Sequence, residues 1–213
     1  MKTEKRKRII IACGLLSSFV LWTVAVCTVD LGQIGPDGAW VGFSTLNAFV
    51  RDLIGVNMTL YLITDWLGLV PILVALAFAI LGGAQWLRRK SLFAVDKSIL
   101  ALGLFYLSVI GVYVLFEMLA LNYRPVLIDG FLEASYPSST TLLTVSVMLT
   151  ALMQIKRRLK CRTLAGYATA LVVLFTAFMV VARILSGVHW ITDIIGGLFV
   201  SLGLVALYSI VEI

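Results

Sequence analysis

The sequence predicts an all-α, polytopic membrane protein: six transmembrane helices, with a short interfacial helix between the first two. Hydrophobic residues make up 61% of the 213 residues and charged residues 13%, whereas soluble domains are about 45–50% apolar. Six apolar segments approach the ~20 residues that a helix needs to cross a bilayer. Short basic clusters border these segments, as is typical of cytoplasmic loops. We therefore expect a single membrane-embedded domain over residues 1–213.

The first apolar segment covers residues 9–29 and follows a basic stretch at residues 2–8. This pattern also occurs in signal peptides, but the apolar run is long enough to span a bilayer and no small-residue cleavage site follows it cleanly. We expect a retained first span that starts on the cytoplasmic side.

The next part of the chain predicts a turn, the interfacial helix and the second span. The sequence GPDG at residues 35–38 is typical of a turn. Residues 40–54 carry apolar side chains at helical spacing around polar ones, which favours a short helix on the outer face. The second span is expected at residues 58–87, with a kink at Pro71. Asp65 within it could approach the outer face of the site, but we expect a packing partner inside the bundle.

The remaining spans are expected at residues 98–121, 137–155, 164–185 and 189–213. Six spans place both chain ends on one side of the membrane, and the basic residues indicate that this side is cytoplasmic. The basic residues assigned to the inner side are Lys2, Lys5, Arg6, Lys7, Arg8, Arg88, Arg89, Lys90, Lys97, Lys156, Arg157, Arg158, Lys160 and Arg162. Only Arg51, Arg124 and Arg183 are assigned to the outer side, so a basic residue there calls for a functional explanation.

The stretch ARILSGVHWITDIIGG, residues 182–197, holds the candidate nucleophile. His189 is the only histidine of the chain. On a helix, His189 and Asp193 would share a face one turn apart, so that the carboxylate fixes one ring nitrogen and leaves the other as a lone pair. Arg183 just upstream can fork onto phosphate oxygens. A single histidine near a helix end is usually a satisfied polar residue, but three ionisable residues at membrane depth favour function.

Two further polar stretches fall at the outer ends of spans. EMLALNYRP, residues 117–125, ends the third span and contains Arg124, and YPSSTT, residues 136–141, begins the fourth. Pro137 is expected to open that span at its first turn. Ser138, Ser139 and Thr140 would then offer free backbone N–H groups and hydroxyls to an anion. Plain helix capping by these residues and a snorkelling Arg124 are the alternatives.

In chain order, these three stretches resemble the motifs of the type 2 phosphatidic acid phosphatase superfamily, which includes membrane lipid phosphatases and, as relatives, vanadate haloperoxidases. The family pattern is K-x6-R-P, then P-S-G-H, then S-R-x5-H-x3-D. The chain keeps the arginines, the proline pair, the first serine, the nucleophilic histidine and the aspartate. It departs from the pattern at Glu117 in place of Lys, Ser139 in place of Gly, Thr140 in place of His and Ala182 in place of Ser.

The resemblance implies an integral membrane lipid phosphatase that works through a phosphohistidine, without metal or cofactor. In that scheme His189 and Asp193 are catalytic. The phosphate-binding residues are Arg124, Ser138, Ser139 and Arg183. Glu117 and Thr140 are candidate acids or substrate contacts. Candidate substrates are polyprenyl diphosphate, phosphatidylglycerophosphate, phosphatidate and diacylglycerol pyrophosphate.

Alternatives remain open at this point. They are a lipid phosphotransferase, and a catalytically impaired relative that binds or moves anionic lipid. Glu117, as an anion, would repel substrate phosphate. If it is buried near the end of the third span, it can instead stay protonated and donate a hydrogen bond or a proton to substrate; a third alternative is that it only pairs with a neighbouring arginine.

Other function classes lack support in the sequence. There is no Walker loop, dinucleotide fingerprint or acidic metal cluster, and Cys13, Cys27 and Cys161 lack metal-ligand spacing. The basic residues border apolar segments, which favours membrane orientation over nucleic-acid binding. The expected location is the plasma membrane, with a lipid substrate at an extracytoplasmic active site.

Overall fold

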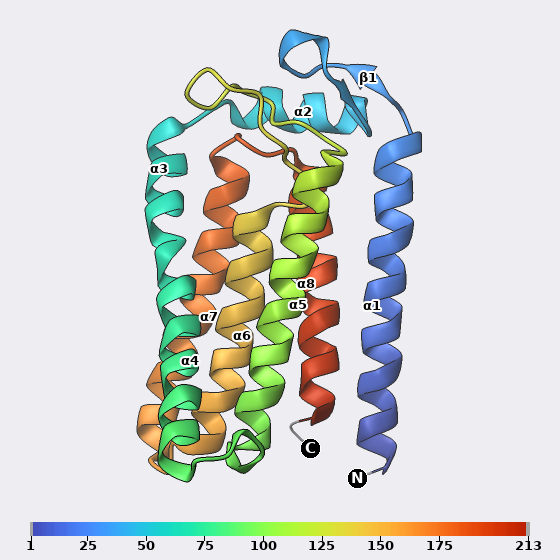
Figure 1. Ribbon diagram of the computed structural model, residues 1–213. Coiled ribbons are helices and arrows are strands. Elements are labelled where there is room, and N and C mark those ends of the chain that lie inside the picture. Colours follow the sequence, from blue (N-terminus) through green and yellow to red (C-terminus); the bar gives the residue numbers. More distant parts are fainter. Residues whose placement is uncertain (1, 212–213) are drawn as a thin grey trace.

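The long helices of the computed structural model, which describes residues 2–211, stand side by side in one bundle (Figure 1). Six of its segments are long and apolar enough to cross a membrane. They are α1 Lys2–Thr28, α3 Met58–Leu67 with α4 Leu69–Arg89, α5 Lys97–Leu119, α6 Ser139–Arg158, α7 Arg162–Leu185 and α8 Ile191–Val211. The predicted all-α membrane fold is thereby confirmed.

The predicted interfacial helix is α2, Ser44–Ile54, which lies across one end of the bundle (Figure 1). Its apolar residues Leu46, Phe49 and Leu53 are exposed, while Asn47 faces inward and is buried. The predicted turn is also present, as a 3-10 turn over Pro36–Gly38. It joins a small antiparallel pair, β1 Gly32–Gln33 and β2 Trp40–Val41, whose two-residue strands are too short to show an alternating pattern in sequence.

The second span is divided at Gly68, within one turn of the predicted kink at Pro71. Proline lacks an N–H group to bond the carbonyl four residues before it, so it is tolerated only in the first turn of a helix. Pro71 stands there in α4, while the Gly68 N–H donates to the carbonyls of Thr64 and Asp65, at 3.0 Å each, to close α3.

Helix α6 lies at the centre of the bundle and packs against α4, α5, α7 and α8, while α1 packs along α8. Most of α6 is buried, whereas α3 and α4 are largely exposed. Its inward face carries small polar side chains such as Thr144, Ser146 and Thr150, which permit close helix approach in membranes. The central helix therefore fixes the loop in front of it, residues 120–138, against the rest of the fold.

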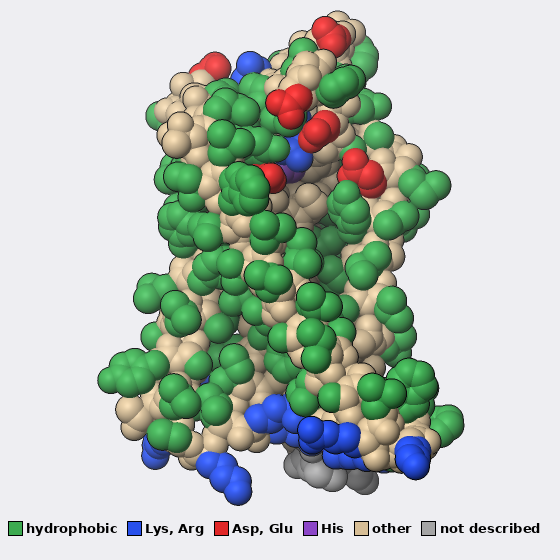
Figure 2. Space-filling model, turned by 60° about the vertical axis from the view of Figure 1, so that its left-hand side comes forward, with side chains coloured by type: hydrophobic (Ala, Val, Ile, Leu, Met, Phe, Trp, Pro, Cys, Tyr) green, Lys and Arg blue, Asp and Glu red, His purple; other side chains and the backbone are tan. Residues whose placement is uncertain are grey.

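Charged side chains divide between the two ends of the molecule. Both chain ends lie at the end opposite α2 (Figure 1), and Lys and Arg side chains gather there, while Asp and Glu side chains gather near α2 (Figure 2). The end that carries α2 also holds the candidate site.

Candidate active site

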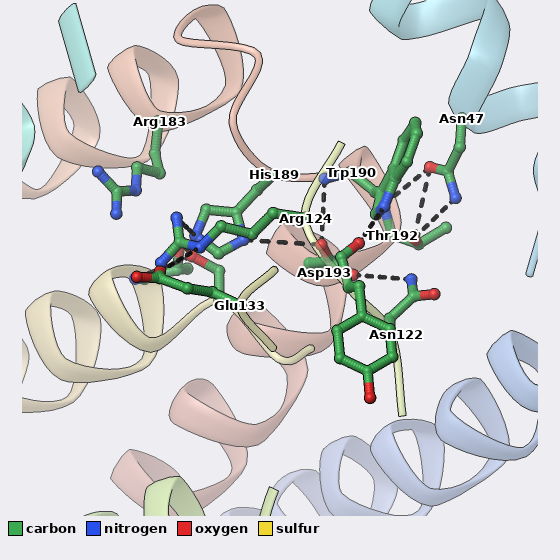
Figure 3. Close-up of polar contacts among 12 residues, drawn as sticks. Asn47, Asn122, Arg124, Glu133, Arg183, His189, Trp190, Thr192 and Asp193 are labelled. Atoms are coloured by element: carbon green, nitrogen blue, oxygen red, sulfur yellow. Dashed lines mark hydrogen bonds and ion pairs between the residues drawn. The ribbon is translucent and has the colours of Figure 1, made fainter. Parts of the chain in front are cut away.

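Four ionisable side chains are buried together beneath the loops at the α2 end: Arg124, Arg183, His189 and Asp193 (Figure 3). They come from the loop before α6, the last turn of α7, the α7–α8 connection and the first turn of α8. The structure thus brings together the residues of two sequence stretches that lie about 60 residues apart.

His189 lies outside the helix in which the sequence analysis placed it. Helix α8 begins at Ile191, so the expectation that His189 and Asp193 share one helix face is wrong. The cause is Gly187, which turns the chain with a φ of +65°. A Cβ there would lie 2.0 Å from the carbonyl oxygen of Gly55, so only glycine fits.

The His189–Asp193 pairing survives this correction. His189 Nδ1 lies 3.6 Å from Asp193 Oδ2, which is longer than a hydrogen bond. Asp193 Oδ2 accepts the Trp190 N–H at 3.0 Å, and Oδ1 accepts from Asn122 Nδ2 at 3.2 Å. The carboxylate is therefore fixed beside the imidazole by two other donors.

Hydrogen bonds between loops hold this arrangement in place. Buried Asn47 of α2 donates to Thr192 Oγ1 at 3.0 Å, and Trp190 Nε1 donates to the Tyr123 carbonyl at 2.7 Å. The Ser138 N–H donates to the Asp193 carbonyl at 3.0 Å. The start of α8 is thus tied to α2, to the loop before α6 and to the cap of α6.

The two arginines face one aromatic ring. The guanidinium carbons of Arg183 and Arg124 lie 4.8 and 5.9 Å from the centre of the Tyr61 ring. Arg183 Nη1 donates to Thr64 Oγ1 at 2.9 Å, and Nη2 lies 4.0 Å from Asp65 Oδ1. A second cation close to the first is tolerable because an aromatic face and hydroxyl and carboxylate oxygens surround the pair.

Arg124 bridges the histidine and an acidic loop residue. Its Nη1 lies 3.3 Å from His189 Nε2, and its Nε lies 3.0 Å from Glu133 Oε2. Burial, followed by the charges of Arg124 and Arg183, lowers the pKa of His189 well below its usual value. The imidazole is therefore neutral at neutral pH, with a lone pair on one ring nitrogen.

Helix α3 contributes more to the site than the sequence predicted. Tyr61, Thr64 and Asp65 follow at helical spacing inside an apolar span, a pattern that could have indicated one polar helix face. The expectation that Asp65 packs inside the bundle is wrong, because its side chain is 59% exposed and faces Arg183. Asn122 and Glu133 were also missed, and no sequence signal distinguishes them within their loop.

The serines before α6 have different roles from one another. Pro137 stands before the helix instead of in its first turn, and Ser138 is the N-cap, with its Oγ accepting from the Thr141 N–H at 3.4 Å. The Ser138 N–H is engaged by Asp193, so the expectation of a free N–H there is wrong. Ser139 lines a polar cavity of about 230 Å³.

Glu117 lines the same polar cavity as Ser139, Arg124 and Glu133. The alternative in which Glu117 is buried is wrong, since α5 ends two residues later and the side chain is exposed. Within residues 2–211, no ion pair joins Glu117 to an arginine.

A second, apolar cavity of about 400 Å³ lies between α3–α4, α5 and α6. Its lining includes Thr140, Ile72 and Ile110, and it shares Ser139 and two other residues with the polar cavity. The polar cavity therefore continues into an apolar one within the membrane-spanning part. Among the described residues, no group of three or more His, Cys, Asp or Glu residues is placed to hold a metal ion.

Comparisons with known proteins agree with this architecture. Residues 99–212, more than half of the chain, match the PAP2 superfamily. The fold is similar to the crystal structure of a transmembrane PAP2 type phosphatidylglycerolphosphate phosphatase from Bacillus subtilis, with a TM-score of 0.56 and 18% identity over 93% of each chain. None of the curated proteins compared with the chain matches it. The chain belongs to the PAP2 superfamily, and its six long apolar helices are those of a multi-pass membrane protein.

Proposed function

We propose that the protein hydrolyses the phosphate or diphosphate group of a membrane lipid, with His189 as the nucleophile. One observation carries the proposal: Nε2 of the single histidine faces the Arg124 guanidinium at 3.3 Å, while its other ring nitrogen faces Asp193. An imidazole with a carboxylate on one side and an anion-binding group on the other is suited to attack phosphorus.

In the first step, the lone pair of His189 Nε2 attacks phosphorus while the bond to the leaving oxygen breaks, and that oxygen keeps the electron pair. The ring becomes positively charged, and Asp193 stabilises this charge from the Nδ1 side. Arg124 and Arg183 balance the charge on the phosphoryl oxygens. In the second step, water attacks phosphorus, the P–Nε2 bond breaks and its electron pair returns to the ring, so phosphate leaves and the ring is neutral again. The proton released by the water passes to bulk water, which also supplies the proton taken up by an alkoxide leaving group. None of these roles requires a metal ion.

The adjoining cavities support a lipid substrate. The polar cavity lined by Arg124 and Ser139 suits a charged head group, and the apolar cavity beside it suits a hydrocarbon chain. The structural relative acts on phosphatidylglycerolphosphate, which makes that lipid a first candidate here. Polyprenyl diphosphate, phosphatidate and diacylglycerol pyrophosphate share the same two chemical parts.

We test the proposal by measuring phosphate release from a panel of these four lipids in detergent. Wild type should release phosphate in the presence of EDTA and be inhibited by vanadate, and His189→Ala should be inactive. Lipid consumption without matching phosphate release would indicate transfer to an acceptor other than water. Turnover by His189→Ala near the wild-type rate would contradict the mechanism.

We also propose that the site faces the extracytoplasmic side of the plasma membrane, with both termini cytoplasmic. The support is the gathering of basic residues at the opposite end of the bundle. The test uses a background in which the three exposed native cysteines are replaced. Phe131→Cys, in the exposed loop of the site end, should react with an impermeant thiol reagent in intact cells. Phe93→Cys, which is 94% exposed at the other end, should react only after lysis; the reverse pattern would contradict this orientation.

A further inference from the structure

We propose that Glu133 is a positioning residue that holds Arg124 across the nucleophilic nitrogen of His189, and that a substrate phosphate displaces Glu133 from Arg124. The inference rests on the proposed function and goes further, because it assigns a role to a loop residue outside the recognised motifs.

The loop backbone brings the two side chains together. Arg124 N–H donates to the Glu133 carbonyl at 3.0 Å, and the neighbouring residues Tyr123 and Ala134 form an antiparallel bridge. Glu133 Oε2 then lies 3.0 Å from Arg124 Nε. Since the backbone bonds form without the carboxylate, its removal should leave the loop in place.

Arg124 and Glu133 form a close ion pair, but the pair lacks hydrogen-bond geometry at Arg124 Nε. Arg124 Nε lies within ion-pair distance of the carboxylate, yet it forms no hydrogen bond of normal geometry and is buried. A buried donor without a hydrogen bond is costly. A phosphate, with oxygens on several sides, can bind a guanidinium in the bidentate manner that this carboxylate lacks.

Arg124 in turn covers the nucleophile. Its Nη1 lies 3.3 Å from His189 Nε2, and the His189 side chain is only 1% exposed. On the side that faces α2, His189 borders a cavity of only about 10 Å³, which is too small for a phosphate, so this side offers no route to the ring. Phosphate can reach Nε2 only if Arg124 moves.

The exposed fractions of the two side chains show that Glu133, and not Arg124, can leave the ion pair for water. The Glu133 side chain is 41% exposed and the Arg124 side chain 9%. Glu133 can turn into water at little cost, and the released Arg124 guanidinium then turns from His189 Nε2 to the phosphate while it stays beside Tyr61. The exchange therefore replaces one carboxylate by one phosphate on the same guanidinium and frees Nε2 for attack.

The sole histidine of the chain permits a test that needs no turnover. Diethyl pyrocarbonate modifies neutral imidazole, so the rate of carbethoxylation, with His189→Ala as background, reports how accessible the ring is. Glu133→Gln should raise this rate about three- to tenfold and tighten the binding of inorganic phosphate by a similar factor. In turnover, KM should fall while kcat stays nearly constant, because a competitor for the ground-state phosphate site has been removed.

Asp129→Asn is the matched control, since it removes an exposed carboxylate from the same loop, and Asp129 lines neither of the two cavities. The rate of carbethoxylation and the affinity for inorganic phosphate should both stay within about twofold of wild type. Should Glu133→Gln fail to fold, Glu133→Asp, whose shorter side chain weakens the contact, should shift both quantities in the same direction.

Weaker phosphate binding or unchanged His189 reactivity in the Glu133 variants would overturn the inference. Neither measurement depends on catalysis. An inactive wild type or an active His189→Ala would therefore defeat the proposed function separately.

Discussion

The two ends of the bundle each hold arginines and carboxylates, but they use them differently. At the basic end, Asp96 accepts from Arg89 Nη1 at 3.0 Å and from Gln85 Nε2 at 2.9 Å, and its N–H donates to Gln85 Oε1 at 3.0 Å. Arg158 approaches the same carboxylate at 3.4 Å. These bonds join α4, the α4–α5 connection and α6, and each carboxylate oxygen has a donor.

At the site end, several buried polar atoms of the described residues have no such partner. Arg183 Nε and His189 Nδ1 are buried and have no hydrogen-bond partner among residues 2–211. Buried polar atoms are nearly always hydrogen-bonded in native proteins. The basic end is therefore a finished structural network, whereas the unpaired donors at the site end support the proposal that a phosphate binds there.

The largest expected effect is that of Asp193→Asn. The amide keeps the shape of the side chain but cannot stabilise a charged imidazole, so kcat should fall by about 10²–10⁴-fold. Phosphate release by purified protein measures this effect. The same exchange at the other end, Asp96→Asn, is the control. A decrease in kcat of less than about tenfold would mean that Asp193 serves chiefly to cap α8 through its hydrogen bond with the Trp190 N–H.

Arg183→Gln should come next, with a loss of about 10²–10³-fold in kcat/KM, the scale of removing one donor to a developing oxyanion. Arg158→Gln removes an arginine from the basic end and should leave kcat/KM nearly unchanged. Equal losses in the two variants would remove the distinction between a ligand site and a structural network.

The contrast between the two ends also shows how far the sequence can predict the structure. Span positions follow from apolar length alone. The placement of Arg183, His189 and Asp193 at one end of the bundle follows from their nearness in sequence, although the helix face assumed for His189 and Asp193 is wrong. The residue at which α8 starts cannot be predicted from the sequence in this way, because it depends on the close approach of Gly187 to Gly55, which lies more than 130 residues away.

The partners of the arginines were equally inaccessible from the sequence. Tyr61 reaches both guanidinium groups only because α3 packs against α7. Glu133 lies beside Arg124 because the backbones of the two residues are hydrogen-bonded within the loop, and no sequence motif indicates this bond. Such contacts belong to the tertiary structure and leave no local pattern.

A smaller effect is expected from the choice of substrate. A diphosphate lipid brings more oxygens to the unpaired donors, and its leaving phosphate is stable as an anion. A monophosphate lipid leaves as an alkoxide, which benefits from a proton donor. Thr140 is a poor acid and lines the apolar cavity. The kcat/KM for polyprenyl diphosphate should therefore exceed that for polyprenyl monophosphate by roughly ten- to hundredfold.

Two variants sharpen this expectation. Thr140→His should narrow the gap between the two lipids if the position reaches the leaving oxygen, and Glu117→Gln should widen it if the exposed Glu117 supplies the proton instead. Equal turnover of both lipids by wild type, with neither variant altering the ratio, would show that proton donation does not limit the reaction.

The smallest effect on turnover should come from Asp96→Asn, because its network serves the fold alone. Turnover should stay within about twofold of wild type, while the free energy of unfolding falls by roughly 1 kcal/mol through the loss of partly exposed charge-assisted hydrogen bonds.

Hydrogen bonds from Gln85 and Arg89 hold the pKa of Asp96 below its usual value. A carboxylate whose pKa is lower in the folded protein than in the unfolded protein stabilises the fold. The full contribution is present at pH values above the pKa of the unfolded state, about 4, and it is lost as the pH falls through the pKa of the folded state. The stability difference between wild type and Asp96→Asn, followed by thermal unfolding in detergent, should therefore be full at neutral pH and shrink in acid. A difference that is independent of pH, or a large loss of turnover, would mean that the basic end does more than hold its helices together.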